Sequence, residues 1–197
     1  MKRLADVTVA GIGLALTAPL LAAAAAAVKL ADGGPVLYRQ RRVGKGGAEF
    51  ELLKLRTMVV GAEQIGTGPA VNEGDSRITL PGGLLRRLSI DELPQLWNVI
   101  RGEMSVIGPR PTLAYQVERY TPHQRRRLEV KPGLTGWAQI HGRARLPWAE
   151  RIELDVWYVD HRSPLLDLKI LARTPLALVS GTYKGESGGW RDSSESP

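Results

Sequence analysis

The longest apolar pattern in the chain lies at its N-terminus. Residues 7–28 carry no charged side chain and include six consecutive alanines. Because about 20 apolar residues cross a bilayer as a helix, the pattern predicts a helix of membrane length over residues 1–31. A cleaved signal peptide, an alanine-rich core helix and a simple spanning helix are the alternatives, and Lys2 and Arg3 give the first of these a suitable basic start.

Charge on both sides of this segment favours a re-entrant arrangement. Lys2 and Arg3 precede it, and five basic residues follow it: Lys29, Arg39, Arg41, Arg42 and Lys45. Basic flanks favour the cytoplasmic side, so a segment that enters and leaves the membrane on one side satisfies both flanks. Pro19 removes a backbone donor and predicts a kink, with the Thr17 hydroxyl expected to satisfy a freed carbonyl. We therefore expect a Pro-broken, re-entrant membrane helix over 1–31.

The remainder of the chain mixes short β-prone pieces with helical spacing. A short strand is expected at 36–38, and residues 61–83 show no sustained period, as in a loop beside a site. Apolar side chains recur at helical spacing in three later segments: Leu113 to Tyr120, Ile152 to Val159 and Leu165 to Leu178. The pattern predicts a helix-rich α/β, or α+β, single domain over 32–180 and a flexible tail over 181–197.

The last two of these helices are amphipathic. Beside a membrane segment they are suited to lie at the interface, with Trp148, Trp157 and Tyr158 near the depth of the headgroups. Ordinary packing in a core is the alternative, and it is the preferred interpretation for the earlier of the two helices.

Composition narrows the classes of partner. A length of 197 residues suits one compact domain, and 27 basic against 20 acidic residues give a net charge of +7. A negatively charged partner follows: nucleic acid, a phosphorylated substrate or an anionic membrane. Cysteine is absent, which excludes disulfides and thiolate metal sites, and His123, His141 and His161 have poor spacing for a metal site.

The densest chemistry lies between residues 88 and 111. Asp91 and Glu92 precede Pro94, which is tolerated only in the first turn of a helix, so local physics favours Asp91 as a helix N-cap. The same position would keep a carboxylate ionised and available as a nucleophile or a metal ligand, with helix N–H groups facing a phosphorylated product. Glu92 suits Mg²⁺, and nearby guanidinium groups suit phosphate: Arg86, Arg87 and Arg110.

Five segments along the chain form a set of motifs: YRQRRVG (38–44), KLRTM (54–58), DELPQLWNVIRGEMSVIGPRP (91–111), KPGLTGWAQI (131–140) and ELDVWYV (153–159). In this order they resemble the bacterial sugar transferases, the monotopic phosphoglycosyl transferases. The resemblance extends through about residue 179, and as a set the motifs are highly specific. Because the chain begins almost directly at the apolar segment, it resembles the small, catalytic-core form of the family.

The resemblance implies transfer of a sugar 1-phosphate from a UDP-sugar to polyprenol phosphate, such as undecaprenyl phosphate. UMP would be released in a first membrane step of glycan biosynthesis. It implies that Asp91 forms a covalent phosphosugar intermediate and that Glu92 helps to bind Mg²⁺. Basic residues at matching positions are the expected phosphate contacts: Lys54, Arg56, Arg86, Arg110 and, less strongly, Arg143. Asp155 also falls in a family motif, without an assigned role.

The resemblance also implies a place in the cell. We expect a monotopic protein of the bacterial inner membrane, in contact with anionic lipids, with its catalytic domain facing the cytoplasm. Two positions depart from the family pattern. Ala18-Pro19 stands where a Ser-Pro break is expected, so the hydroxyl would come from Thr17, and His141 stands where Asn is frequent. The motifs specify neither the sugar nor an oligomeric state.

Two rival functions use the same bulk features. A basic membrane- or nucleic-acid-associated binding protein without catalysis accounts for the charge, but not for Asp91 and Glu92 between two Pro-containing turns. The aromatic residues also lack the pattern of a base-stacking sheet, so no nucleic acid is expected. A secreted structural protein with a mature N-terminus near Val28 is the third possibility.

Overall fold

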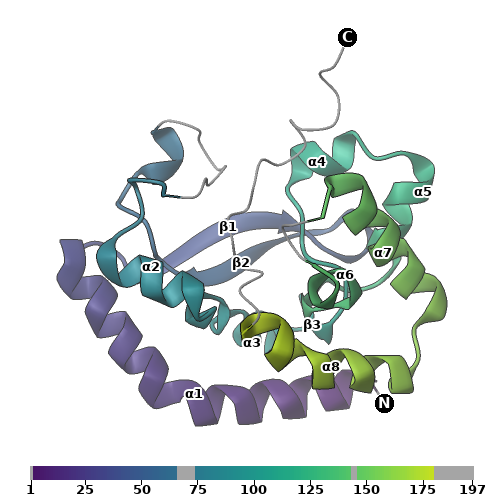
Figure 1. Ribbon diagram of the computed structural model, residues 1–197, viewed down its shortest axis with the longest axis horizontal. Helices are drawn as coiled ribbons and strands as arrows, with labels where there is room; N and C mark the ends of the chain where they lie inside the picture. The colour runs from purple at the N-terminus through teal and green to yellow at the C-terminus, as the bar shows by residue number, and fades with distance from the viewer. Residues whose placement is uncertain (1, 66–73, 143–145, 180–197) are drawn as a thin grey trace.

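The computed structural model describes residues 2–65, 74–142 and 146–179, which form one helix-rich α/β domain (Figure 1). Its helices and strands are α1 (Lys2–Asp32), β1 (Leu37–Val43), β2 (Glu49–Leu55), α2 (Leu80–Arg87), α3 (Gln95–Arg101), β3 (Ser105–Ile107), α4 (Ala114–Glu118), α5 (Pro122–Arg125), β4 (Gly133–Thr135), α6 (Trp137–Ile140), α7 (Trp148–His161) and α8 (Pro164–Val179). Short 3₁₀ turns lie at η1 (Lys45–Gly47), η2 (Ala62–Gln64), η3 (Ile90–Glu92) and η4 (Arg126–Glu129). The predicted helix-rich α/β single domain with a long apolar N-terminal helix is confirmed, and the predicted tail over 181–197 lies outside the described residues.

The apolar segment forms α1, a continuous helix that passes through Pro19. Figure 1 shows it curving along the lower edge of the molecule. The Thr17 hydroxyl donates to the carbonyl of Gly13 at 2.7 Å. It therefore does not serve the carbonyl of Ala15, which Pro19 leaves without its helical donor. The role predicted for Thr17 is wrong, because the hydroxyl bonds back within its own turn.

Both ends of α1 are fastened to the rest of the domain. Near the start, Arg3 donates to carbonyls in the last turn of α3. Buried Asp6 accepts a hydrogen bond from Ser105 at 2.9 Å. At the other end, Asp32 accepts two hydrogen bonds from the guanidinium of Arg56. A helix tied at both ends is part of the fold, which argues against a cleaved leader.

One stripe of α1 packs on the domain and the rest of its surface is exposed. Ala10 packs with side chains of α3, and Ala24 and Val28 pack with Leu55 and Leu85. Most of its large apolar side chains point away from the protein: Leu4, Val9, Ile12, Leu16, Leu20 and Leu30. The helix therefore has the length and composition to enter a membrane while a narrow face holds it to the domain.

Strands β1 and β2 form an antiparallel hairpin, from Leu37 opposite Leu55 to Val43 opposite Glu49. The predicted strand ended at residue 38, but β1 continues to Val43, and its exposed and half-buried side chains alternate between two faces. Its half-buried positions are Tyr38, Gln40 and Arg42, and its exposed positions are Leu37, Arg39 and Arg41. The hairpin therefore presents one row of polar side chains toward the protein.

The Gly-Pro-Arg-Pro turn at 108–111 is fixed on two sides. Strands β3 and β4 pair in parallel, and Gly108 lies so close to the other chain segment that an added Cβ would meet the Lys131 carbonyl oxygen at 2.4 Å. After the turn, Thr112 bridges to Val43 at the end of β1. The turn thus has a defined position between the small sheet and the hairpin.

The segment 61–83 is not a loop throughout, as the sequence suggested. Helix α2 begins at Leu80 because Thr79 caps it, accepting a hydrogen bond from the Gly82 amide at 3.1 Å, and because Pro81 lies in its first turn. An added Cβ on Gly82 would lie 2.0 Å from the Thr57 carbonyl oxygen. The glycine that suggested a loop therefore allows the helix to approach the end of β2.

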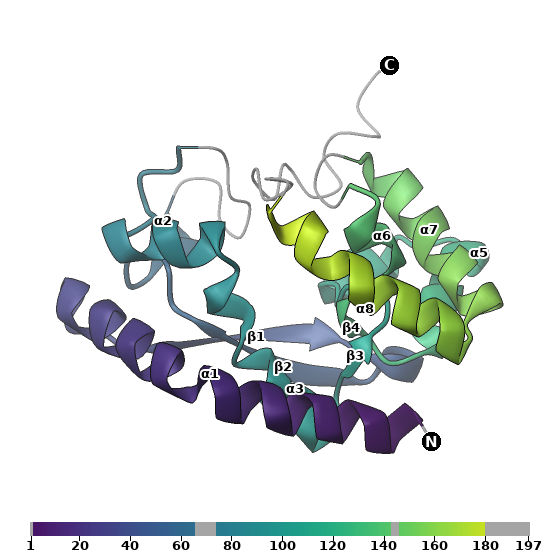
Figure 2. The same cartoon turned by 60° about the horizontal axis from the view of Figure 1, so that its bottom comes forward.

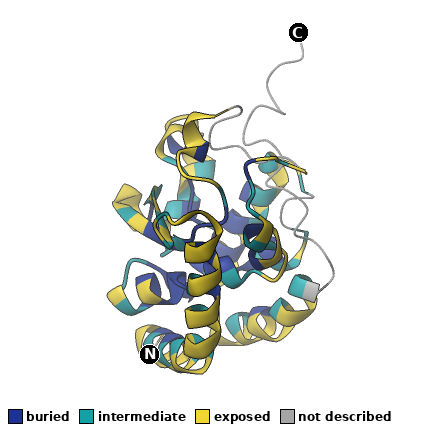
Figure 3. Ribbon diagram, turned by 90° about the vertical axis from the view of Figure 1, so that its left-hand side faces the viewer, coloured by how far each residue is buried: buried dark blue, intermediate teal, exposed yellow. Residues whose placement is uncertain are grey.

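The three later helical patterns are confirmed as helices, with different surroundings. Val117 and Tyr120 are buried at and just after α4, and Ile152, Val156 and Val159 form the buried face of α7. In α8 the predicted apolar positions Leu165, Leu168 and Leu171 are exposed. Figure 3 shows buried residues gathered at the centre of the molecule and exposed ones over its outer helices. Leu165, Leu168, Leu171 and Leu176 form an exposed surface of α8, the leucine face, which does not contribute to the core.

Candidate active site

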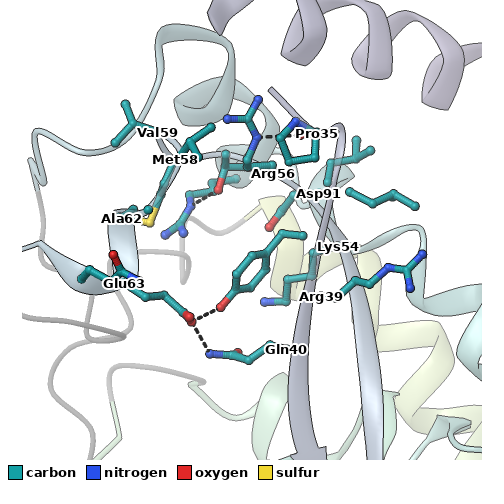
Figure 4. A pocket seen from close by; sticks show the side chains of 18 of the residues that line it. Pro35, Arg39, Gln40, Lys54, Arg56, Met58, Val59, Ala62, Glu63 and Asp91 are labelled. Atoms are coloured by element: carbon teal, nitrogen blue, oxygen red, sulfur yellow. Dashed lines mark hydrogen bonds between the residues drawn. The ribbon is translucent and has the colours of Figure 1, made fainter. Parts of the chain in front are cut away.

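A cavity of about 540 Å³ lies between the hairpin and residues 58–64. Four of the predicted site residues line it: Lys54, Arg56, Arg86 and Asp91. Figure 4 shows Asp91 and Lys54 toward one side of the cavity and Glu63 toward the other. A volume of this size suits a small-molecule ligand, and the basic side chains suit an anionic one.

Asp91 does not cap a helix, which corrects the prediction from the sequence. It lies in the 3₁₀ turn η3, after Ser89 in a left-handed conformation with φ of 56°, and α3 begins only at Gln95. Pro94, which has no side-chain acceptor, occupies the N-cap position. The left-handed residue turns the chain so that both carboxylates point inward, and Asp91 is only 3% exposed.

The Asp91 carboxylate is buried without full hydrogen bonding. Its Oδ1 atom is buried and has no hydrogen-bond partner. Burial, with a smaller effect from the charge of Glu92, raises the pKa of Asp91 to about 6, against the opposing effect of three nearby cations, Lys54, Arg86 and Arg110. The prediction that a helix end holds this group firmly ionised is therefore wrong. The result is a basic, under-coordinated oxygen of the kind that a nucleophile needs.

Glu92 lies next to Asp91 and is surrounded by basic groups. Lys54 Nζ lies 3.4 Å from Glu92 Oε1, and Arg110 Nη2 donates to the same oxygen at 2.6 Å. The Glu92 side chain is 4% exposed. Arg110 comes from the Gly-Pro-Arg-Pro turn, so the fixed turn brings a cation from residue 110 to the acidic pair.

The remaining predicted basic residues have distinct surroundings. Arg86 donates through Nε to Thr57 at 2.7 Å. Arg56 is 7% exposed, and its guanidinium bonds to Asp32 and to the Pro35 carbonyl. Arg56 thus fastens the end of α1 to β2, and its role as a phosphate contact stays a prediction. Arg143 lies outside the described residues.

A buried ion pair behind the turn was not recognised from the sequence. Arg127 donates to Asp155 at 2.5 Å, to the Tyr120 hydroxyl at 2.6 Å and to the carbonyl of Arg110 at 2.9 Å. Arg127 and Asp155 are both almost fully buried. The available signals were Arg127 within a basic run and Asp155 within a motif. Their pairing across 28 residues needed the fold, and it holds the backbone of Arg110.

The acidic pair suits Mg²⁺ in its chemistry. The unpartnered Oδ1 of Asp91 and the adjacent Glu92 offer the hard oxygen ligands that this ion takes, one or two at a time, beside substrate phosphates. Within residues 2–65, 74–142 and 146–179, no group of three or more His, Asp and Glu side chains is arranged to hold a metal.

Comparison with known proteins gives the class of this site. The profile of the family described as bacterial sugar transferase matches residues 1–181. An uncharacterized sugar transferase, EpsL of Bacillus subtilis, is 48% identical over 174 residues, which cover 88% of this chain and 85% of that protein.

Two further relatives carry more specific names. A UDP-glucose:undecaprenyl-phosphate glucose-1-phosphate transferase of Caulobacter vibrioides is 45% identical, over 91% of this chain and 70% of that protein. A UDP-N-acetylgalactosamine-undecaprenyl-phosphate N-acetylgalactosaminephosphotransferase of Aeromonas hydrophila is 41% identical, over 92% of this chain and 44% of that protein. The fold and the acidic, cation-lined cavity are thus those of a sugar transferase. The chain belongs to the bacterial sugar transferase family.

Proposed function

We propose that this protein transfers a sugar 1-phosphate from a UDP-sugar to undecaprenyl phosphate and releases UMP, with Asp91 as the nucleophile. The observation that carries the proposal is the buried, unpartnered carboxylate of Asp91 at a cavity lined by Lys54 and Arg86. Relatives named as undecaprenyl-phosphate sugar phosphotransferases supply the reaction class. This reaction accounts for the acidic pair, which a basic binding protein does not need.

In the first step, an Asp91 oxygen attacks the phosphorus that carries the sugar. A bond forms between that oxygen and phosphorus, and the bond to the bridging oxygen breaks, so that UMP leaves with the electron pair. Lys54, Arg86 and Arg110 lie close enough to Asp91 to influence its charge, and cations in this position stabilise negative charge on the phosphoryl oxygens. We therefore assign to each of these basic residues the role of stabilising the transition state.

In the second step, an oxygen of undecaprenyl phosphate attacks the same phosphorus. The Asp91–phosphorus bond breaks, which restores the carboxylate and leaves the sugar on a lipid diphosphate. Glu92 and Asp91 would hold Mg²⁺, which supplies charge neutralisation at the phosphates when bound. Two displacements at one phosphorus explain why a single nucleophile suffices for two substrates.

We further propose that α1 is the monotopic membrane segment and that the domain faces the cytoplasm. Both ends of α1 contact the same domain, so both ends lie on one side of any membrane that the helix enters. Its 31 residues measure about 46 Å, longer than the hydrocarbon core. Figure 2 shows α1 and α8 on the same forward side of the molecule, and both carry exposed leucines. This surface supports contact with the bilayer in which the lipid substrate resides.

The test of the proposed reaction is release of UMP. Purified protein is incubated with Mg²⁺, undecaprenyl phosphate and each of a panel of UDP-sugars. At least one UDP-sugar is expected to yield UMP and a lipid-linked sugar in equal amounts. Absence of both products across the panel would contradict the proposal, whereas nucleic-acid retention that survives high salt would favour the binding-protein alternative.

A further inference from the structure

The cavity has a second polar end, which the proposed chemistry does not use. Tyr38 and Gln40 each donate to Glu63 Oε1, Gln40 through Nε2 at 3.0 Å. All three residues line the cavity. Figure 4 shows Glu63 on the opposite side of the cavity from Asp91. The site therefore combines a cationic end with an acidic, hydrogen-bonding end.

Glu63 is held in place by a row of side chains along β1. The Gln40 amide is fixed in orientation, because its oxygen accepts from Arg42 at 2.6 and 3.0 Å while its nitrogen donates to Glu63. Arg42 in turn donates to the carbonyl of Pro111, in the turn that carries Arg110. The position of Glu63 is thus coupled to the turn that carries Arg110, one of the cations near Asp91.

The second carboxylate oxygen of Glu63 is available to a ligand. Both hydrogen bonds end on Oε1, and within the described parts of the chain Oε2 accepts none. The residue is exposed. Because an ionised carboxylate can accept about four hydrogen bonds, the two bonds from Tyr38 and Gln40 leave room for further donors.

The charge of Glu63 restricts what it can bind. A carboxylate repels phosphate, so the diphosphate of a nucleotide sugar belongs at the Asp91 end, where Lys54 and Arg86 lie. Neutral hydroxyl groups are suitable donors, and binding of a ribose hydroxyl by a carboxylate is a recurring arrangement in nucleotide sites. The two rings on either side of a diphosphate, ribose and the transferred sugar, both present such hydroxyls.

We propose that Glu63, oriented by Tyr38 and Gln40, binds ring hydroxyl groups of the nucleotide sugar and so contributes to substrate specificity. This inference rests on the proposed function. Ribose and the transferred sugar both offer neutral hydroxyl donors on a ring. Inhibition by UMP distinguishes which of the two rings Glu63 binds.

The test compares Glu63→Gln with Glu49→Gln. Glu49 is an exposed carboxylate on the same hairpin, 3.7 Å from Arg41, and it does not line the cavity. For Glu63→Gln we expect KM for the UDP-sugar to rise roughly tenfold with kcat within about threefold, because one charge-assisted hydrogen bond is weakened. Tyr38→Phe should shift KM in the same direction by a smaller factor. Glu49→Gln should leave KM unchanged.

Inhibition by UMP identifies the ring. If Glu63 binds ribose, the inhibition constant of UMP rises with KM. If it binds the transferred sugar, UMP inhibition is unchanged and the kcat/KM ratio between two UDP-sugars changes instead. Unchanged KM, ratio and UMP inhibition in Glu63→Gln would overturn this inference while leaving the proposed reaction intact. A wild-type protein that turns over no UDP-sugar would overturn the proposed reaction itself.

Discussion

The charge state of Asp91 is the central property at the scale of single residues. The left-handed Ser89 and the 3₁₀ turn bury this side chain beside Glu92, and burial rather than a helix end determines its pKa. Three cations nearby keep the ionised form accessible at neutral pH. The proposed nucleophile is therefore both basic and ionisable.

The activity should depend on pH through this group. The free-enzyme pKa of Asp91 is raised to about 6, and only the ionised carboxylate attacks phosphorus. We therefore expect kcat/KM to be level above about pH 7 and to fall about tenfold per pH unit below pH 6, since kcat/KM reports the free enzyme. Initial rates of UMP release between pH 5 and 8 measure this. A profile that stays level down to pH 4.5 would mean that Asp91 has an ordinary pKa.

Because its pKa is raised, the ionised Asp91 carboxylate destabilises the folded state at neutral pH. The folded state binds the proton more tightly than the unfolded state, because the folded pKa lies above 3.8. Stability linked to this group therefore rises as pH falls from above 6 toward 4, and at pH 7.5 the ionised form destabilises the fold by up to about 3 kcal/mol. Asp91→Asn should raise the free energy of unfolding by about 1–3 kcal/mol in thermal melts at pH 7.5.

The control for that measurement is Asp75→Asn. Asp75 is also a buried carboxylate, with 8% side-chain exposure, but it accepts hydrogen bonds from Arg77 at 2.6 and 2.9 Å. Its removal should lower stability. Equal destabilisation by both variants would show that burial does not strain Asp91.

At this scale the sequence predicted which side chains lie together better than what surrounds them. Asp91, Glu92, Lys54, Arg86 and Arg110 do come together, as the ordered motifs implied. Local spacing could not show that Ser89 adopts a left-handed conformation and buries Asp91. Nor could it show the partner of Arg56, because Asp32 lies 24 residues away in the chain.

At the scale of elements, the pair Arg127–Asp155 joins η4 to α7 beneath the turn that carries Arg110. Both charges are buried, so removing one leaves the other without compensation. Such a loss typically costs about 3–5 kcal/mol, whereas replacement of both charges by apolar groups costs much less. The pair therefore serves mainly to position the Arg110 backbone.

Arg127→Met is expected to lower the free energy of unfolding by about 3–5 kcal/mol. The double variant Arg127→Met/Asp155→Leu should be more stable than Arg127→Met alone, yet show reduced kcat, because the Arg110 carbonyl loses its donor. The neighbouring Arg126→Met, which breaks a half-exposed pair with Asp160, serves as the control and should change stability far less, because solvent screens this pair. Full activity in the double variant would contradict the positioning role.

The leucine face of α8 is the second feature at this scale. The sequence left membrane contact and core packing open for this helix, and the structure exposes Leu168 and Leu176 at 64% and 72%. Leu168→Glu/Leu176→Glu should weaken binding to anionic vesicles about tenfold or more. Melting temperature should be nearly unchanged because neither side chain is in the core. Vesicle co-sedimentation measures the binding.

A matched control is Tyr115→Glu. Tyr115 is 43% exposed on α4, which lies on the opposite side of the molecule from α1 and α8 (Figure 1). It should leave vesicle binding unaltered. Similar losses in both variants would indicate a charge effect rather than a docking face.

At the scale of the whole molecule, α1 is the segment that we propose to enter the membrane. Its apolar length and basic flanks were evident in the sequence, but the predicted break at Pro19 is not confirmed, because α1 continues from Lys2 to Asp32. The contacts that decide its topology were not, because Arg3 and Asp6 reach residues about 100 positions away. A hydropathy pattern describes a segment, whereas the fold shows that both of its ends meet one domain.

The topology is testable with single cysteines, since the natural chain has none. Lys2→Cys and Lys45→Cys should both react with an impermeant maleimide from the cytoplasmic side only. Labelling from opposite sides would contradict the monotopic arrangement.

Trapping of the intermediate tests the central claim most directly. The protein is incubated with Mg²⁺ and a UDP-sugar labelled in the sugar, without undecaprenyl phosphate, and then denatured. Wild-type protein should retain about one labelled sugar phosphate per chain and release one UMP, and peptide mapping should place the label on Asp91. Asp91→Asn should retain none. Label elsewhere, or retention and full turnover in Asp91→Asn, would contradict Asp91 as the nucleophile.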